Sequence, residues 1–466
     1  MTQPHYDRLT QLDNSFLVYE ETDPSTAMHV ASTQIHEAKP LQRADGSLDI
    51  ERIEEYVLSR LDRIPRYRQR IRRTPIEGHP VWVDDASFNI HYHVRHARLP
   101  HPGNERQLKR LVGRIFSQRL DREKPLWELW VIEGLEGDRL AVLSKVHHCM
   151  VDGVSGSELI AALLTPIPQE KPDPPSHWVP RPVPSTLALG SGEIARVARV
   201  PFSLGAAARR VLRDEDNTRH DWSERLRAMA RVVGSTGIAT PVSFNRPVGP
   251  YRRIDWVTLP LDEVKRVSRS LGATVNDVVL ATAAGGFGEF LTRDRGMDLD
   301  DVHFQVLAPV SVRRDDERGA LGNRVSAWTV DLPIAETDPV ARLECICEET
   351  KKLKESHAAL GAETLSQAAE WTGAGFLSLG ARLVALGTPF NTVVTNIPGL
   401  YLLESRMLEI HPHVPLMGTL GVGIALFSYD GALSWGFSAD WDLVPDLHQL
   451  VSHTQNAFAE LSAAVR

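Results

Sequence analysis

The sequence predicts an α/β protein with mixed sheets, built as two bodies around a proline-rich connection. A chain of 466 residues exceeds what one hydrophobic core usually supports. Between Thr165 and Pro184, 8 of 20 residues are proline, and such a stretch forms a stiff, extended spacer. Segments of strand-like and helix-like pattern alternate on both sides of it, which is typical of α/β folds.

In the N-terminal body, the segment Ile53–Leu61 places its apolar residues at helical spacing and stops before Pro65. The strand Leu140–Val146 is apolar and runs directly into His147 and His148, so it would carry these side chains on its end. The other elements expected here are strands at Val81–Val83, Ile90–Val94 and Glu128–Glu133, and helices at Glu105–Leu120 and Ser155–Leu164.

The C-terminal body repeats the alternation, and no short repeat period is visible. Its expected strands are Ile254–Leu259, Val302–Pro309, Arg324–Asp331, Asn391–Asn396 and Gly431–Ser438. Its expected helices are Leu261–Leu271, Val275–Arg293, Pro339–His357 and Pro445–Ala464.

Composition and charge exclude several classes of protein. With 24% charged and 42% hydrophobic residues the chain is neither fibrous nor largely disordered, and a net charge of −8 argues against wrapping nucleic acid. Cys149, Cys345 and Cys347 form neither a disulfide framework nor a zinc pattern and suit a reducing cytoplasm. The N-terminus lacks the pattern of a signal peptide, and the longest apolar stretch, Leu416–Phe427, is too short to span a bilayer.

Two segments are locally basic. Glu193–Arg213 carries five arginines against one glutamate among apolar residues; it could lie on an anionic membrane or pack as a helix across a domain junction. Arg60–Arg73 holds seven arginines against one aspartate and could be a solvated or phosphate-facing edge. Its only aromatic residue is Tyr67, which argues against a nucleic-acid site.

The strongest chemical signal is the run from His147 to Gly153, with sequence HHCMVDG. A histidine at a strand end is a competent general base near neutral pH, Asp152 can brace the loop, and Gly153 permits close backbone approach. A metal site from His147, His148 and Asp152, a Cys149 nucleophile, and histidines that merely fill the core are the competing interpretations.

This motif resembles the HHxxxDG signature of the bacterial wax ester synthase/acyl-CoA:diacylglycerol acyltransferases, relatives of the chloramphenicol-acetyltransferase-like and condensation-domain enzymes. Further matches follow in the family's order along nearly the whole chain. They are LDNSFLVYE (Leu12–Glu20), MHV (Met28–Val30), PLW (Pro125–Trp127), ND (Asn276-Asp277), PVSVR (Pro309–Arg313) with Gly322-Asn323, and TNIPG (Thr395–Gly399). In the last, Thr395 replaces the usual serine and Leu400 follows where proline is common, but the hydroxyl remains.

The resemblance implies two chloramphenicol-acetyltransferase-like subdomains with mixed sheets flanked by helices, with a tunnel at their interface. We expect the N-terminal subdomain with the histidine motif at residues 1–164, the Pro-rich linker and helical connection at 165–250, and the C-terminal subdomain at 251–466.

The implied activity is O-acyl transfer from a long-chain acyl-CoA to a lipid hydroxyl, of diacylglycerol or of a long-chain alcohol. In that reaction the resemblance makes His148 the general base and Asp152 structural. His147 is expected to shape the loop or the approach of the acceptor, and Gly153 supports the motif. Asn276 is the candidate donor to the oxyanion, against the alternative that it caps the helix that follows. Trp127 is interpreted as a core residue, and the arginines of Arg60–Arg73 are a possible surface for the anionic coenzyme A.

No metal and no cofactor beyond the acyl-CoA co-substrate is expected. Since a thioester is already reactive and its thiolate is a good leaving group, a covalent acyl-enzyme is not required. The expected location is cytoplasmic and peripheral on a membrane or lipid droplet. The alternatives are an acyltransferase of the condensation or polyketide-associated type, acting on a carrier-bound acyl group, and a non-catalytic lipid-surface protein. An intact histidine motif argues against the second, and oligomeric state is left open.

Overall fold

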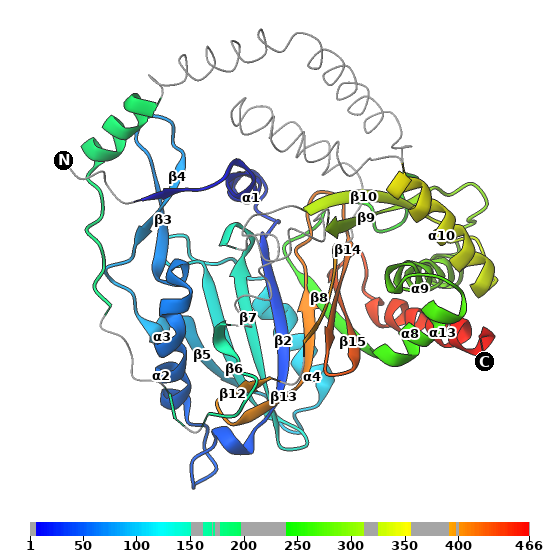
Figure 1. The fold of residues 1–466 in the computed structure, drawn as a ribbon, viewed down its shortest axis with the longest axis horizontal. Coiled ribbons are helices and arrows are strands. Elements are labelled where there is room, and N and C mark those ends of the chain that lie inside the picture. Colours follow the sequence, from blue (N-terminus) through cyan, green and yellow to red (C-terminus); the bar gives the residue numbers. More distant parts are fainter. Residues whose placement is uncertain are drawn as a thin grey trace.

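A six-stranded mixed sheet organises the N-terminal part of the molecule (Figure 1). In this computed structural model the described residues are 6–150, 162–169, 171–172, 178–196, 239–311, 325–355, 391–397 and 400–465. The strand order is β12 (Tyr401–Leu402), β13 (Ser405–His413), β2 (His29–Glu37), β7 (Arg139–His147), β6 (Trp127–Leu135) and β5 (Val94–Arg98). Only the β5–β6 pair is parallel, so the sheet is mixed as expected.

The C-terminal part is built on a four-stranded sheet. Its order is β11 (Asn391–Ile397), β14 (Val422–Tyr429), β15 (Ala432–Asp440) and β8 (Arg252–Pro260), with β11 and β14 parallel. Two smaller antiparallel sheets complete the described strands: β9 (Phe304–Ser311) with β10 (Val325–Leu332), and β1 (Asp7–Arg8), β4 (Pro80–Asp84) and β3 (Gln69–Arg73).

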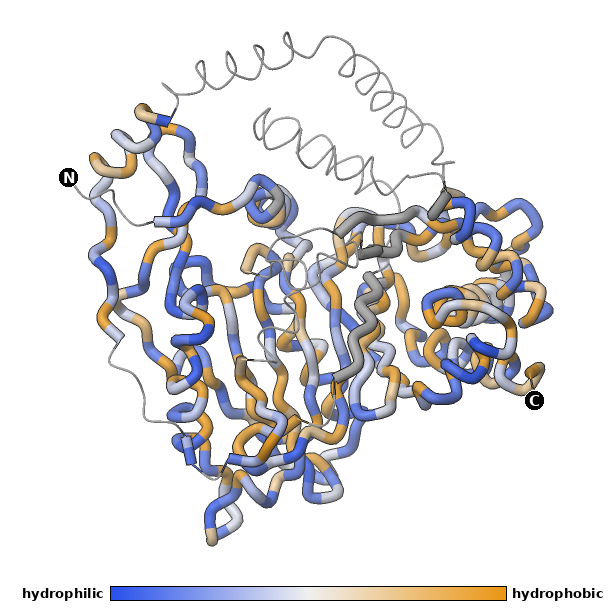
Figure 2. The backbone as a smooth tube through the Cα atoms, in the orientation of Figure 1, coloured by the Kyte–Doolittle hydropathy of each residue, from blue (hydrophilic) through white to orange (hydrophobic). Residues whose placement is uncertain are grey.

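The six-stranded sheet is covered on both faces because side chains alternate along its central strands. On β7, Val142 packs with the helix α2 (Ile50–Arg60), whereas the next residue, Leu143, packs with α4 (Glu105–Phe116) on the other side. Apolar residues therefore follow these strands in Figure 2. The two-sided burial makes the sheet a rigid support for the residues at the strand ends.

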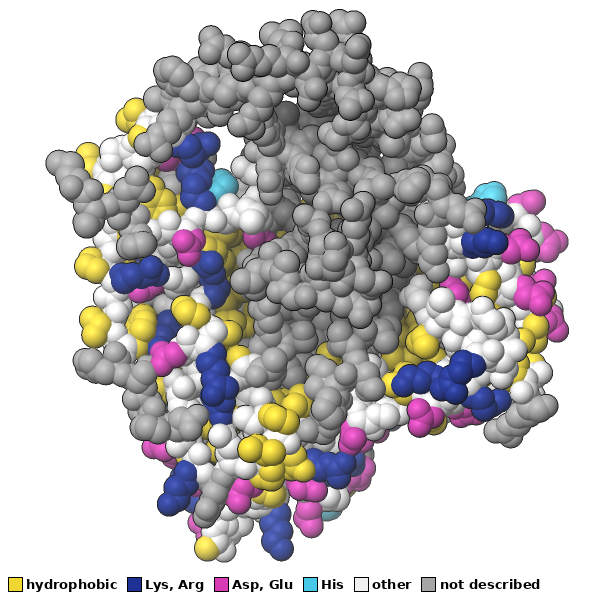
Figure 3. All heavy atoms as spheres, in the orientation of Figure 1, with side chains coloured by type: hydrophobic (Ala, Val, Ile, Leu, Met, Phe, Trp, Pro, Cys, Tyr) yellow, Lys and Arg dark blue, Asp and Glu magenta, His cyan; other side chains and the backbone are white. Residues whose placement is uncertain are grey.

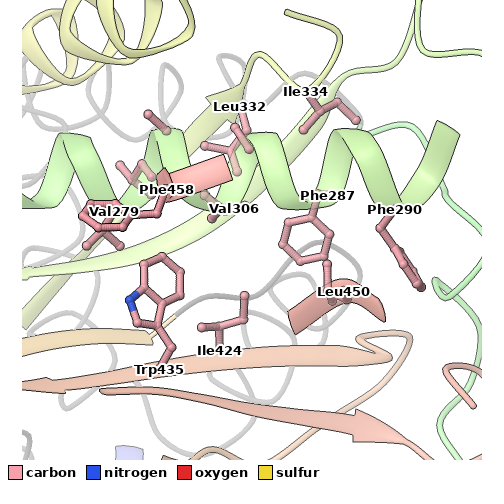
Figure 4. Packing of buried hydrophobic residues seen from close by; sticks show 14 of the residues in the cluster. Val279, Phe287, Phe290, Val306, Leu332, Ile334, Ile424, Trp435, Leu450 and Phe458 are labelled. Atoms are coloured by element: carbon pink, nitrogen blue, oxygen red, sulfur yellow. The ribbon is translucent and has the colours of Figure 1, made fainter. Parts of the chain in front are cut away.

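The C-terminal sheet buries one face against a layer of helices. These helices are α8 (Leu261–Ser270), α9 (Val275–Glu289), α10 (Pro339–Glu355) and α13 (Leu447–Ala464). Figure 4 shows the contact, in which Phe287 of α9 and Phe458 of α13 face Trp435 and Ile424 of the sheet. After Glu289 the helix α9 continues as a π-turn, Phe290–Asp294, which completes the longer helix expected from the sequence.

The two parts are joined through close backbone contacts. The helix α4 lies against β8, and a Cβ at Gly113 would stand 2.9 Å from the carbonyl oxygen of Arg252. The strand β13 belongs to the C-terminal range of the chain, yet it pairs with β2 in the N-terminal sheet and crosses β15. At that crossing a Cβ at Gly436 would stand 1.7 Å from the carbonyl oxygen of Pro412.

Most expected elements are confirmed, with one wrong assignment. Ile90–Val94 was expected to be a strand, but Ile90–His93 forms the helical turn α3 because the side chain of Asn89 accepts a hydrogen bond from the His91 amide and caps it. The strand β5 begins only at Val94. The expected helix Ser155–Leu164 falls mostly outside the described residues.

Within the described parts of the chain, no helix is both long enough and apolar enough to cross a bilayer.

Candidate active site

The tandem histidines lie at the end of the central strand β7, as the sequence predicts. His147 is the last residue of the strand, and His148 begins a single 3-10 turn, His148–Met150. The His147 amide donates to the carbonyl oxygen of Leu126 at 2.9 Å, and the His148 amide donates to that of Met28 at 2.8 Å. The PLW and MHV motifs thus hold the two histidines through backbone hydrogen bonds.

The helix α1 (Gln11–Thr22) covers the histidines from the other side. The ring of Phe16 lies over the imidazole of His148 with their centroids 4.1 Å apart. One turn further on, Glu20 Oε2 stands 3.5 Å from His147 Nε2, and its other oxygen accepts the Met28 amide at 3.2 Å. The side chains of Glu20 and His147 are 2% and 1% exposed.

Arg122 completes this buried network. Its Nε and Nη2 donate to Glu20 Oε2 at 3.1 and 2.5 Å, and Nη2 also donates to the carbonyl oxygen of Leu17 at 3.0 Å. Burial alone would raise the pKa of Glu20, but its contacts with His147 and with the guanidinium of Arg122 outweigh burial and hold that pKa at about 2. Glu20 is therefore an anion at neutral pH.

Both histidines are neutral at physiological pH. Burial lowers the pKa of His148 to about 4, and the neighbouring His147 lowers it further in the same direction. Burial also lowers the pKa of His147, against the opposing effect of Glu20. A neutral imidazole has a lone pair with which to accept a proton, which is the state that a general base requires.

Cys149 is poorly suited to act as a nucleophile. Its side chain is buried against Leu9, Leu17 and Trp82, and burial raises the pKa of its thiol well above the ordinary value. The reactive thiolate is therefore disfavoured. The interpretation of Cys149 as a nucleophile loses its physical support.

Two expected site residues cannot be placed, because Asp152 and Gly153 lie outside the described residues. Among the described residues, no group of three or more histidine, cysteine, aspartate or glutamate side chains could hold a metal ion.

Asn276 lies in the first turn of α9 and is half-buried. It is not the cap of that helix: Thr274 is, in a capping box in which Asp277 accepts the Thr274 amide at 2.8 Å. Asp277 also accepts the hydroxyl of Thr350 on α10 at 2.9 Å, so the second residue of the ND motif is structural. None of the hydrogen bonds described for the chain joins Asn276 to His148.

The arginines of Arg60–Arg73 do not form the open cationic edge considered from the sequence. Arg60 and Arg68 are buried, the former against the ring of Tyr56 and the latter in an ion pair with Asp62 at 2.5 Å. Four more, Arg66, Arg70, Arg72 and Arg73, bind protein groups. The segment mainly fastens the chain to itself, which weakens its case as the coenzyme A surface.

Trp127 is a core residue, as expected: it is 1% exposed and its indole donates to the carbonyl oxygen of Tyr67 at 2.8 Å. Sequence reasoning did not assign roles to Phe16, Glu20 and Arg122. Phe16 and Glu20 lie in the LDNSFLVYE motif, which the sequence analysis identified. The motif alone does not show that these two side chains contact the histidines.

The fold, with mixed sheets flanked by helices, matches the two-domain fold of the chloramphenicol-acetyltransferase-like and condensation-domain class. The first condensation domain of the calcium-dependent antibiotic synthetase superposes with a TM-score of 0.61 at 15% identity, covering 100% of this chain and 97% of that one. A wax ester synthase/diacylglycerol acyltransferase from Marinobacter aquaeolei VT8 superposes with a TM-score of 0.66 at 23% identity, covering 98% and 99%.

Within that class, the sequence profile of the wax ester synthase/diacylglycerol acyltransferase catalytic domain matches residues 9–279, and that of the family's C-terminal domain matches residues 321–462. A putative diacylglycerol O-acyltransferase of Mycobacterium tuberculosis H37Rv is 31% identical over 98% of this chain and 90% of its own length. A probable diacylglycerol O-acyltransferase of the same strain is 30% identical over 98% and 96%. The chain belongs to the wax ester synthase/diacylglycerol acyltransferase family of acyltransferases.

Proposed function

We propose that this protein transfers a long-chain acyl group from acyl-CoA to the hydroxyl of diacylglycerol or of a long-chain alcohol, with His148 as general base. The observation that carries the proposal is the neutral imidazole of His148, fixed at the end of β7 by the Met28 carbonyl and covered by Phe16. Family membership supports the reaction class, and the names of the mycobacterial relatives favour diacylglycerol as acceptor.

The reaction needs one proton acceptor and no covalent acyl-enzyme. His148 takes the proton of the alcohol as its oxygen attacks the thioester carbonyl carbon. The tetrahedral intermediate then collapses, the carbon–sulfur bond breaks, and the thiolate of coenzyme A receives the proton from the imidazolium. Because the thiolate is a good leaving group, the proposal requires neither Cys149 nor a metal or other cofactor.

The supporting residues have separate parts in the proposal. His147, held between the Leu126 carbonyl and the Glu20 carboxylate, fixes the strand end on which His148 stands. Asp152 and Gly153 shape the loop that follows. Asn276 donates its amide to the developing oxyanion, a contribution typically of about 3–4 kcal/mol in the transition state.

The long apolar substrates imply that catalysis takes place at the surface of a membrane or lipid droplet. A carrier-bound acyl donor, as the likeness to condensation domains would permit, is the competing proposal; the two donors give different thiol products and can be told apart directly.

The test uses the purified chain, palmitoyl-CoA and either dioleoylglycerol or hexadecanol, with free coenzyme A and lipid ester both quantified. We expect release of coenzyme A that depends on the acceptor and equals the ester formed. Release without an acceptor, or none at all, would contradict the proposal. In the His148→Ala variant we expect turnover to fall by about 10²–10⁴-fold with the fold retained.

A further inference from the structure

An apolar ridge projects from the end of the molecule that carries the β3–β4 hairpin. It consists of Ile76 in the hairpin turn and of Leu187 and Ile194 on a helix over residues 186–196. These side chains are 61%, 86% and 63% exposed, and they are three of the few large apolar residues exposed in the described chain. Figure 1 shows the helix beside the N-terminus, and apolar side chains stand at that end of the surface in Figure 3.

The three residues form one continuous surface. Leu187 and Ile194 are seven residues apart and share a helix face, with Gly190 between them. A Cβ at Gly190 would lie 3.4 Å from Cγ of Pro75 and 3.9 Å from Cδ1 of Ile76, so the hairpin turn lies against the helix at this glycine. The opposite face of the helix is already used, because Leu189 is buried against Val81 and Val83.

The ridge is held rigidly in this exposed position. The carboxylate of Glu193 accepts hydrogen bonds from the amides of Ile76 and Glu77, both at 2.9 Å, and so ties the helix to the turn. Arg72 Nη1 donates to the carbonyl oxygen of Pro184 at 3.0 Å, just before the helix begins. An apolar surface that is fixed outward in this way needs a partner to cover it.

Arginines surround the ridge in excess of its acids. Arg8 and Arg196 share the single carboxylate of Glu77. Arg72 binds only uncharged groups among the described residues, the Pro184 carbonyl and the hydroxyl of Thr186. The combination of inserted apolar side chains and flanking guanidinium groups is the chemistry that fits an anionic phospholipid surface.

The position of the ridge also suits a lipid acceptor. From the turn, β4 leads to Trp82, which packs with Leu17 of α1 and with Cys149, the neighbour of His148. Ile76 and Trp82 are six residues apart, and an extended strand advances about 3.3 Å per residue. The ridge is therefore within roughly 20 Å of the side chains that pack beside the tandem histidines.

We propose that the ridge of Ile76, Leu187 and Ile194 docks the enzyme on an anionic phospholipid surface, with its arginines at the headgroups. This inference rests on the proposed function for its purpose, delivery of a lipid acceptor, but its binding step can be measured without catalysis. The three residues of the ridge lie outside the histidine motif.

The test compares binding to sucrose-loaded vesicles of phosphatidylcholine alone and with phosphatidylglycerol. We expect wild type to bind the anionic vesicles, and the Leu187→Ser/Ile194→Ser variant to bind at least about tenfold more weakly, because a buried leucine side chain contributes about that factor. Arg72→Gln should reduce the preference for phosphatidylglycerol. The matched control is Ile167→Ser, which removes an isoleucine that is 66% exposed and lies beside β12, and it should bind as wild type does.

A second measurement separates docking from catalysis. With palmitoyl-CoA and hexanol as a dissolved acceptor, the double variant should release coenzyme A at the wild-type rate, and only turnover of diacylglycerol in vesicles should fall. Unchanged vesicle binding by the double variant would overturn the proposed docking surface. That conclusion would hold even if the two substitutions converted a dimer into a monomer. Wild-type vesicle binding without any acyl transfer would instead overturn the proposed function and leave the docking surface supported.

Discussion

The carboxylate of Glu20 stands 3.5 Å from Nε2 of His147, and neither side chain reaches solvent to more than 2% of its surface. The contact joins the first helix of the protein to the end of the central strand β7. Glu20 also accepts a hydrogen bond from the amide of Met28, which directly precedes β2, and β2 pairs with β7. One buried anion therefore connects α1, β2 and β7 around the site. This arrangement fixes the end of β7, directly before His148.

We predict that Glu20→Gln lowers the free energy of unfolding by about 2 kcal/mol at neutral pH. Removing one partner of a fully buried pair costs about 3–5 kcal/mol, but Arg122 is partly exposed and keeps Glu21 as a second partner. The measurement is thermal unfolding, with Glu21→Gln as the matched control. Glu21 pairs with the same arginine at a half-exposed position and should have a small effect.

The effect of Glu20→Gln should depend on pH. The pKa of Glu20 is lowered from 4.5 to about 2 in the folded protein, so its ionised form stabilises the fold above pH 4.5 and that stabilisation is lost as pH falls towards about 2. The difference in Tm between wild type and variant should therefore narrow below pH 4.5. A difference that is constant down to pH 3 would show that charge is not its cause.

For catalysis we predict a plateau of kcat/KM across neutral pH. A base with a pKa of about 4, as burial gives His148, is unprotonated from pH 8 down to about pH 5 and is titrated only below that. The measurement is kcat/KM against pH with palmitoyl-CoA and hexadecanol, with intrinsic fluorescence reporting folding at each pH. An acidic limb at pH 6.5 would mean that the catalytic imidazole is solvated and not held as the structure describes.

Phe16 should influence catalysis by keeping the pKa of His148 low, which makes it a positioning residue. Its ring lies 4.1 Å from that of His148, so Phe16→Ala opens one side of the imidazole to water and should raise the pKa of His148 from about 4 towards 6.5. The acidic limb of the pH profile then moves upward. Phe16→Leu, which keeps an apolar side chain, should restore the wild-type profile, whereas a purely structural role for Phe16 would lower activity equally at every pH.

The sequence predicts the local features of the site better than it predicts which residues contact the histidines. The tandem histidine at the end of a strand is readable because an apolar run leads directly into it. That Leu126 and Met28 would hold its backbone, or that Glu20 would meet His147, depends on elements brought together by the tertiary fold. The order of the motifs along the chain does not give the distances between them in the folded protein.

There are also physical reasons why the sequence did not predict the strands β13 and β14. β14 is buried at every position, so it lacks the alternation that marks a half-exposed strand, and its glycine-containing sequence suggested only an apolar stretch. β13 pairs with a strand far away in the sequence. The burial of Arg60 and Arg68 follows from their partners Tyr56 and Asp62, which composition alone cannot assign.

The proposed oxyanion donor can be separated from the cap of its helix. We predict that Asn276→Ala lowers kcat by about 10²–10³-fold with little change in KM, because the amide acts only in the transition state. Thr274→Ala is the matched control: it removes the N-cap of α9 and should lower the free energy of unfolding by about 1 kcal/mol while turnover stays near wild type. Wild-type turnover in Asn276→Ala would remove Asn276 from the mechanism.

The crossing of β13 over β15 gives a last prediction, on how the two sheets are held together. At Gly436 a Cβ would stand 1.7 Å from the carbonyl oxygen of Pro412, a distance that no real side chain tolerates. Gly436→Ala must therefore separate the two backbones, and we expect a loss of about 1–3 kcal/mol or more in the free energy of unfolding. Ser434→Ala on the same strand provides the control, because it alters a buried side chain whose hydroxyl contacts Thr258 of β8 at 3.4 Å. Since β13 pairs with β2, and β2 with β7, the displacement should also reach the tandem histidines, so kcat should fall in Gly436→Ala even at temperatures where the protein is fully folded. Wild-type kcat in a destabilised Gly436→Ala protein would show that the strand end bearing His148 is insulated from the crossing.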